Sequence, residues 1–220
     1  MRADLHIHTY HSPDSEQRIE EVLRAAARLC LGAIAVSDHN SLGGAIETMN
    51  TAPPELLVIP AIEVSSAEGH ILAYNVTDEV PRDKSAAETI ELIHARGGIA
   101  VAAHPYRLWN GLGSKVVLDN RFDAIEAMNG RNTERGNAKA IELAQRAHLP
   151  MTGGSDAHCA ENIGSGLTVF PDDCTTVEDL IRAILDGRTH VEGAGRDAKE
   201  TWRYGSKSIW RWIGRGMKRI

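Results

Sequence analysis

Histidine and acidic residues recur in short motifs at the ends of predicted strands, and this pattern constrains the fold of the chain more than any other. His6 and His8 are two residues apart in a predicted strand, which would point both imidazoles to the same face. Leu5 and Ile7 would then point to the opposite face, toward a core. Similar motifs follow further apolar runs: Asp38-His39, His104-Pro105 and Asp156-Ala157-His158. In a parallel α/β sheet, strand ends of this kind meet at one edge, where sites are built.

Short apolar runs alternate with amphipathic stretches of helical period along most of the chain. About seven strand–helix steps favour one parallel sheet of barrel-like shape, covered by helices, over two domains. Residues 107–114, rich in Gly and Asn, are expected to form a loop. The predicted strands are Ala3–His8, Ala33–Ser37, Leu56–Ser65, His70–Val76, Ile99–Ala103, Phe122–Met128, Met151–Gly154, Leu167–Phe170 and Thr189–Glu192. The predicted helices are Arg18–Leu31, Ser41–Met49, Ala86–Arg96, Glu134–His148 and Thr176–Asp186.

Nine residues of metal-ligand type come from the strand ends and the turns beside them. They are His6, His8, Asp14, His39, Glu63, His70, His104, Asp156 and His158. Zinc takes about four ligands, so nine candidates with a bridging carboxylate among them indicate two or three ions. Mixed imidazole and carboxylate ligands suit zinc, manganese or iron better than calcium. A single histidine at a strand end is more often structural, but the joint placement argues against that explanation for the whole set.

The remaining histidines and the cysteines carry weaker signals. His94, His148 and His190 are expected at the surface or in packing, whereas His11, near Asp14, stays open as a substrate contact. Cys159 is expected to be a small packing residue. The three cysteines form no CxxC pair, and no signal peptide or apolar run of about 20 residues is present, which predicts a cytoplasmic protein without a transmembrane segment.

The C-terminal segment differs in charge from the rest of the chain. Residues 196–220 hold eight Lys/Arg against two Asp/Glu, whereas the body holds 16 against 28. We therefore divide the chain into a domain at 1–195 and a basic amphipathic helical tail at 196–220. The tail would carry a basic stripe of Lys199, Arg203, Lys207, Arg211, Arg215 and Arg219. Packing on the acidic body, binding of nucleic acid and binding of an anionic membrane surface all stay open for it.

The motifs resemble, in the same order, those of the PHP (polymerase and histidinol phosphatase) family. The matching segments are Asp4-Leu5-His6-Ile7-His8-Thr9, Ser37-Asp38-His39-Asn40, Ile62-Glu63-Val64, Gly69-His70-Ile71-Leu72, His104-Pro105 and Gly154-Ser155-Asp156-Ala157-His158. The resemblance covers about residues 1–192. It implies an α/β fold, a distorted (β/α)7 barrel, with a metal cluster at the mouth formed by the C-terminal strand ends.

The resemblance also implies how the ligands divide among the ions. One ion would be held by His6, His8, Glu63 and Asp156; a second by Glu63, His70 and His104; a third by Asp14, His39 and His158. Asp14 departs from the pattern, because the family acid often belongs to a Ser-Asp-Gly run and here the run is Ser-Pro-Asp-Ser. Larger phosphoesterases of the family insert a domain between the last two motifs, whereas only 51 residues separate His104 from Asp156. We therefore expect a mouth that is open, or covered by 107–114 or by a neighbouring subunit.

By this resemblance the chain is expected to be a metal-dependent hydrolase of phosphate esters. A metal-bridged hydroxide would attack a small phosphate monoester or nucleotide, with Asp156, His158 and Glu63 as catalytic residues. Arg107 and Arg131 are the candidates for binding the phosphate, although a solvated surface position is an equal alternative for each. A nuclease acting on short oligonucleotides, a histidinol phosphate phosphatase and a non-catalytic metal-stabilised module remain as alternatives. The oligomeric state is left open.

Overall fold

The computed structural model describes residues 1–196 of the chain. The predicted basic stripe of the tail and most of the tail itself lie outside these described residues. The strands are β1 (Arg2–Ile7), β2 (Ala33–Val36), β3 (Leu57–Ser65), β4 (His70–Tyr74), β5 (Ile99–Ala102), β6 (Ala124–Asn129), β7 (Met151–Gly154), β8 (Gly166–Val169) and β9 (His190–Gly193). The helices are α1 (Ile19–Arg28), α2 (Gly43–Thr51), α3 (Ala86–His94), α4 (Gly113–Asp119), α5 (Glu134–Ala147) and α6 (Val177–Leu185), with a 3₁₀ turn at Ala160–Asn162.

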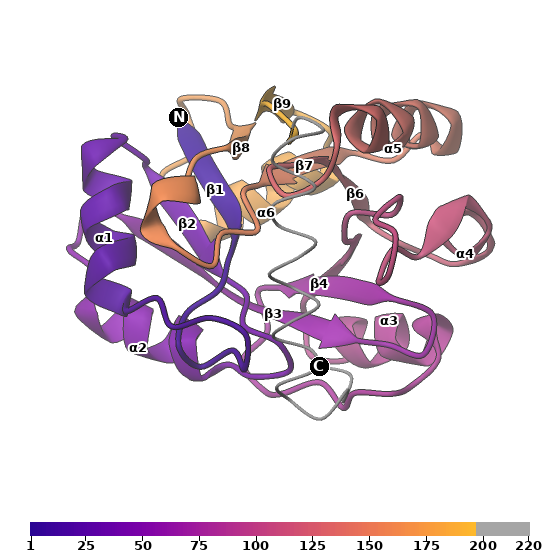
Figure 1. Cartoon of the computed structure of the whole chain (residues 1–220), viewed down its shortest axis with the longest axis horizontal. Helices are drawn as coiled ribbons and strands as arrows, with labels where there is room; N and C mark the ends of the chain where they lie inside the picture. Colours follow the sequence, from indigo (N-terminus) through magenta and orange to yellow (C-terminus); the bar gives the residue numbers. More distant parts are fainter. Residues whose placement is uncertain (197–220) are drawn as a thin grey trace.

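The nine strands form one sheet in the order β7-β6-β5-β4-β3-β2-β1-β8-β9. Pairing is parallel between β1, β2 and β3 and between β5, β6 and β7, and antiparallel on both sides of β4 and of β8. The sheet curves into a nearly closed barrel with helices around its outside (Figure 1). The expected barrel-like α/β fold is therefore confirmed. It is distorted from a fully parallel barrel because β4 and β8 run in the opposite direction to their neighbours.

Strand β4 is antiparallel because its connection to β3 is too short for a parallel crossover, which needs a dozen or more residues. Ser66 closes this turn by bonding Gly69, with its backbone N–H donating to the Gly69 carbonyl over 2.9 Å. The reversal places the first residue of β4, rather than its last, beside the last residues of the neighbouring strands.

Strand β7, at one end of the sheet, packs closely against β1 and β8, because two of its four residues are glycines. A Cβ on Gly154 would lie 2.3 Å from the Cβ of His6, and one on Gly153 would lie 2.4 Å from the backbone oxygen of Leu167. The hydroxyl of Thr168 in β8 donates to the Gly153 carbonyl over 2.9 Å, and the backbone N–H of His8 donates to the Ala157 carbonyl over 2.9 Å. The end of β7 is thereby held against β1, which brings Asp156 and His158 beside His6 and His8.

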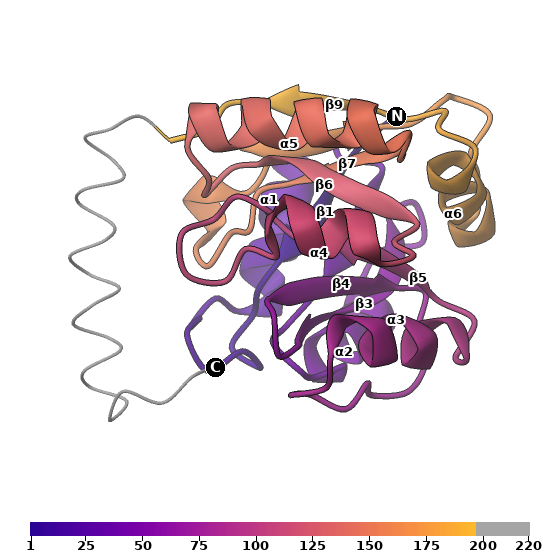
Figure 2. The same cartoon turned by 90° about the vertical axis from the view of Figure 1, so that its right-hand side faces the viewer.

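The barrel interior and its outer surface pack as separate apolar clusters. The interior is built largely from alanines, with Leu5 and the fully buried Tyr74 among its larger side chains, and α6 adds Leu180 and Ile184. The helix α6 covers the end of the barrel opposite the loop that follows β1 (Figure 2). In described residues 1–196, no helix is long and apolar enough to span a membrane.

Two local expectations were wrong. Leu5 and Ile7 do not share a face: Leu5 lies in the barrel interior, while Ile7 packs in the outer cluster with Val22 of α1. The cause is a register shift between Asp4 and Ile7, since an irregularity of this kind re-aims the side chains that follow it. The segment expected to be a loop up to Ser114 becomes helical at Gly113, where α4 begins.

Candidate metal centre

All nine candidate ligands lie together at one end of the barrel. They come from the ends of β1, β3 and β5, from the start of β4, and from the segments that follow β1, β2 and β7. The most exposed of the nine side chains, that of Asp14, has 13% of its surface exposed. The ligand atoms form four overlapping groups, each of them within 4.8 Å: His8, Asp14, His39, His158; His6, His104, Asp156; His6, His8, Glu63; and His39, Glu63, His70.

The first cluster, which we call site 1, surrounds the two histidines of β1. The Nε2 atoms of His6 and His8 lie 3.0 Å apart and 3.4 Å and 3.2 Å from Glu63 Oε2. Asp156 Oδ1 lies 3.5 Å from the Nε2 atom of His8 and 4.0 Å from that of His6. Two imidazole nitrogens and two carboxylate oxygens therefore face a common point, as the ligands of a four-coordinate ion do.

The second cluster, site 2, shares Glu63 with site 1 through the other carboxylate oxygen. Glu63 Oε1 lies 2.7 Å from His70 Nδ1 and 2.8 Å from His104 Nε2. The other ring nitrogen of His104, Nδ1, is buried without a hydrogen-bond partner among residues 1–196. Because one Glu63 oxygen faces each cluster, this carboxylate has the position of a bridging ligand.

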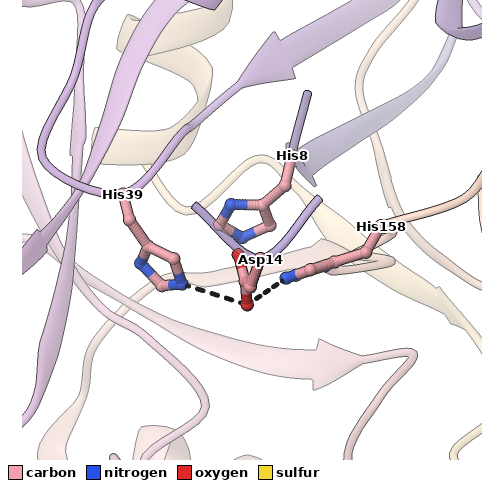
Figure 3. A group of neighbouring side chains, drawn as sticks. All are labelled: His8, Asp14, His39 and His158. Atoms are coloured by element: carbon pink, nitrogen blue, oxygen red, sulfur yellow. Dashed lines mark hydrogen bonds and ion pairs between the residues drawn. The ribbon is translucent and has the colours of Figure 1, made fainter. Parts of the chain in front are cut away.

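The third cluster, site 3, gathers Asp14, His39, His158 and His8 (Figure 3). Asp14 Oδ2 lies 2.8 Å from His158 Nε2 and 3.8 Å from His39 Nε2. The rings of His8 and His158 are 4.3 Å apart between centroids, so site 3 directly adjoins site 1. The substitution of the family's Ser-Asp-Gly run by Ser-Pro-Asp-Ser thus leaves Asp14 in the cluster.

The protonation states of His8 and His39 suit a divalent cation. Burial lowers the pKa of His8 to about 4 and that of His39 to about 3, so both imidazoles are neutral at pH 7, the form that binds metals. Burial by itself would raise the pKa of Glu63, but the imidazoles of His70 and His6 and the hydrogen bond with His104 hold it well below its usual range. The donor set is therefore the one expected for zinc, manganese or iron.

Backbone strain marks two of the candidate ligands. His104 has a φ of 27° and Asp156 a φ of 54°, in a region that costs a side-chain-bearing residue free energy and persists only where the surroundings enforce it. The surroundings of Asp156 include Asp4, whose Oδ1 accepts from the backbone N–H of Ser155 over 2.9 Å. Strain of this kind concentrates at functional sites.

Glu126, a buried carboxylate in β6, forms hydrogen bonds with two of the candidate ligands, His6 and His104. It was not among the residues predicted from the sequence. Its Oε1 lies 2.8 Å from His6 Nδ1, and its Oε2 accepts from the backbone N–H of His104 over 2.8 Å and from Asn129 Nδ2 over 3.0 Å. Asn129 in turn contacts Asp156 Oδ2 over 3.3 Å. A carboxylate only accepts hydrogen bonds, so Glu126 keeps a proton on His6 Nδ1, and Nε2 is the ring nitrogen that faces site 1. The signal was present, since Glu126 interrupts the apolar residues Ala124, Ile125, Ala127 and Met128 of this strand.

Comparisons with known proteins agree with this geometry. The sequence model of a family described as PHP-associated matches residues 134–189. The Methanocaldococcus jannaschii protein MJ1587 is 33% identical over 141 residues, which are 59% of this chain and 82% of that protein. A Bacteroides vulgatus protein of two domains, described as containing a predicted PHP-like metal-dependent phosphoesterase, has a TM-score of 0.73 to this chain, 18% identity, and coverage of 88% of this chain. The chain belongs to the PHP family.

Two of the solved structures extend beyond this chain and share its fold at low identity. The chain spans 65% of the Bacteroides vulgatus protein. It also spans 58% of the lesion-specific endonuclease PfuEndoQ from Pyrococcus furiosus, which covers 87% of this chain with a TM-score of 0.66 and 18% identity. In this PHP chain the stretch between His104 and Asp156 holds only α4, β6, α5 and β7, so no inserted domain covers the site from there.

The two arginines singled out in the sequence reach the cluster of this PHP protein. Arg131 Nη1 lies 2.8 Å from Asp156 Oδ1 and 2.8 Å from His158 Nε2, and Arg107 donates to Asp156 Oδ2. Burial would raise the pKa of Asp156, but the two guanidinium groups hold it well below its usual range. Both side chains are thus located beside the candidate ligands rather than on a distant surface.

The other histidines of this PHP protein lie outside the cluster. His94 Nε2 pairs with Asp123 over 2.7 Å, and His148 follows α5. His190 is exposed, and His11 Nε2 bonds Glu47 over 2.8 Å. The expectation that Cys159 is a packing residue was wrong, because its side chain is exposed next to the 3₁₀ turn, where its sulfur accepts from Asn162.

Proposed function

We propose that this PHP protein is a metal-dependent phosphoesterase that hydrolyses small phosphate monoesters or nucleotides. The observation that carries the proposal is the convergence of six imidazoles and three carboxylates on sites 1 to 3, with two arginine side chains at the edge of the same cluster. A structural role would need far fewer buried ionisable groups, which are costly to bury without partners.

The division of ligands follows the three clusters. Site 1 would hold an ion with His6, His8, Glu63 and Asp156, site 2 with Glu63, His70 and His104, and site 3 with Asp14, His39 and His158. Bound divalent ions supply Lewis acidity, which acidifies water and neutralises charge on phosphoryl oxygens. Two or three ions of zinc, manganese or iron are proposed.

The chain's own groups would bind and orient the substrate. Arg107 and Arg131 present guanidinium groups at Asp156, where they could form paired hydrogen bonds to a phosphate. Asp156, His158 and Glu63 are proposed as the catalytic residues, because Glu63 joins sites 1 and 2 and the other two contact Arg131. No Ser-His-Asp arrangement is required of the chain in this scheme.

A nuclease acting on short nucleic acids is the second candidate. Its specific support is the likeness of fold to endonuclease Q, solved in complex with a 27-mer duplex, together with the absence of an inserted domain between His104 and Asp156. Both candidates use the same cluster and differ only in the group that the phosphate carries.

Phosphate release by purified full-length protein tests the proposal. The chain would be loaded with manganese, zinc or iron and assayed against phosphate monoesters, nucleotides and short oligonucleotides, beside an Asp156→Asn variant. We expect metal-dependent release by the wild-type chain and at least a 100-fold loss in the variant, on the order of the effect of removing one catalytic group. Equal activity in the two proteins would reject the assigned role. Tight metal binding with no turnover of any substrate would favour the non-catalytic module.

A further inference from the structure

The segment between Arg107 and Leu112 exposes two large apolar side chains beside the candidate metal centre. Leu108 is 85% exposed and Trp109 is 83% exposed, whereas no other large hydrophobic residue among residues 1–196 exceeds 51%. Exposure of an aromatic side chain of this size leaves its apolar surface in water, which costs free energy unless a ligand or partner covers it.

This segment is anchored on both sides of the tryptophan to residues of the cluster. On one side, the Arg107 side chain donates to Asp156 and its backbone N–H donates to the His104 carbonyl over 2.9 Å. On the other side, the carbonyl of Asn110 accepts from the backbone N–H of His70 over 3.1 Å. The backbone on either side of Trp109 is therefore tied to residues that supply ligands to sites 1 and 2.

The backbone of the segment is compact. The N–H of Gly111 donates to the Arg107 carbonyl over 3.2 Å, and a Cβ on Gly111 would lie 2.6 Å from that same oxygen. Only glycine fits this turn, which folds the chain back and projects Leu108 and Trp109 outward. In Figure 2 the connection before α4 lies on the same side of the barrel as the loop after β1.

Positive charge accompanies the exposed tryptophan. Arg107 and Arg131 contact Asp156, and Lys139 of α5 lies over the ring of Tyr106, 5.7 Å from its centroid. An anionic ligand with a planar apolar group matches this combination of cations and one exposed indole. A nucleotide has both features, because its phosphate is anionic and its base offers a π face.

We propose that Trp109 is a stacking platform for the nucleobase of a substrate whose phosphate binds at the metal centre. The inference rests on the proposed phosphoesterase function and narrows its substrate class to nucleotides and nucleic-acid ends. Stacking on an aromatic side chain tolerates any base, so Trp109 would select for the presence of a base and not for its identity. Leu108, next to it, would border the same base.

A matched pair of ligands tests the platform in the full-length, metal-loaded protein. Adenosine 5′-monophosphate and ribose 5-phosphate share the phosphate and sugar and differ by the base. The measured quantity is the preference for the first over the second, as a ratio of kcat/KM values or, where neither is hydrolysed, as a ratio of Kd values from calorimetry. The variants are Trp109→Ala and Trp109→Phe, with Leu118→Ala of α4, 47% exposed, as the matched surface control.

The wild-type chain should prefer the nucleotide by about 5- to 150-fold, the range that corresponds to the stacking of one base. Trp109→Ala should bring the ratio close to one, Trp109→Phe should keep most of it, and Leu118→Ala should leave it as in the wild type. A wild-type ratio near one, or a ratio unaffected by Trp109→Ala, overturns the proposal. So does a dimer of the wild-type chain that Trp109→Ala dissociates, because the tryptophan would then be an interface between copies.

Failure of the proposed function gives a different result. A chain that hydrolyses no phosphate ester but binds the nucleotide better than ribose 5-phosphate through Trp109 would refute the phosphoesterase and keep the platform. A chain that hydrolyses both compounds equally well, with and without Trp109, would keep the phosphoesterase and refute the platform.

Discussion

Replacing Glu126 by glutamine is expected to weaken metal binding while the barrel stays folded. The carboxylate accepts three hydrogen bonds in the interior, from the His6 ring, the His104 backbone N–H and Asn129 Nδ2. Glutamine has nearly the same shape but one acceptor oxygen and one amide NH₂ group. Whichever way it turns, its NH₂ faces the ring N–H of His6 or the backbone N–H of His104.

The size of the effect follows from those contacts. Loss of a partner that orients a metal-binding histidine typically costs 10- to 100-fold in metal affinity, about 1.4–2.7 kcal/mol. One donor left unsatisfied in the interior costs about 1–3 kcal/mol of stability. We therefore expect metal affinity to fall at least 10-fold in Glu126→Gln. In the presence of chelator the variant should still unfold cooperatively, at a lower temperature than the wild-type chain.

Competition with a fluorescent zinc chelator measures the affinity, and thermal unfolding in excess chelator measures the fold separately. Tyr74→Phe is the matched control, because Tyr74 is buried in the same interior and its hydroxyl donates to the Leu5 carbonyl over 2.9 Å, with no hydrogen bond to a candidate ligand among residues 1–196. The control should lose about 1 kcal/mol of stability and keep its metal affinity. Wild-type metal affinity in a folded Glu126→Gln protein would refute the reasoning.

Three further outcomes are expected. Asp156→Asn should retain the wild-type circular dichroism spectrum while losing turnover; full activity would contradict its role. Gly154→Ala should lower the free energy of unfolding by about 1–3 kcal/mol in denaturant titration, because its Cβ would lie 2.3 Å from His6 Cβ, and unchanged stability would show that β7 can move away. Removal of metal should lower the Tm by about 5–10 °C relative to protein at 100 times Kd of free metal; an unchanged calorimetric Tm would contradict binding to the folded state.

Much of the site could be anticipated because its signals are local. The i, i+2 spacing of His6 and His8 and the glycines before Asp156 are visible in a few residues of sequence. The alternation of apolar runs and amphipathic stretches was enough to predict a barrel-like α/β fold. His70 was predicted as a ligand although its strand is reversed, and the short turn before it explains why it still reaches the common rim.

The remaining features depend on contacts that sequence periodicity does not report. The register shift in β1 separates Leu5 from Ile7, because strand pairing and not side-chain alternation decides where a strand becomes irregular. Glu126 is one of two acids in the predicted strand Phe122–Met128, and its role is visible only when β6 pairs with β5 and faces His6 of β1 across the barrel. The start of α4 at Gly113 was hidden by Asn110 and Gly111, which precede it.

Counting the metal ions held by purified full-length protein tests the central claim most directly. The protein would be incubated with zinc, manganese or iron, passed through a metal-free column and analysed by mass spectrometry for ions per chain. The account predicts two or three ions per chain, and a lower count in a Glu63→Gln variant because this carboxylate faces both site 1 and site 2. A folded chain that retains none of the three metals would contradict it.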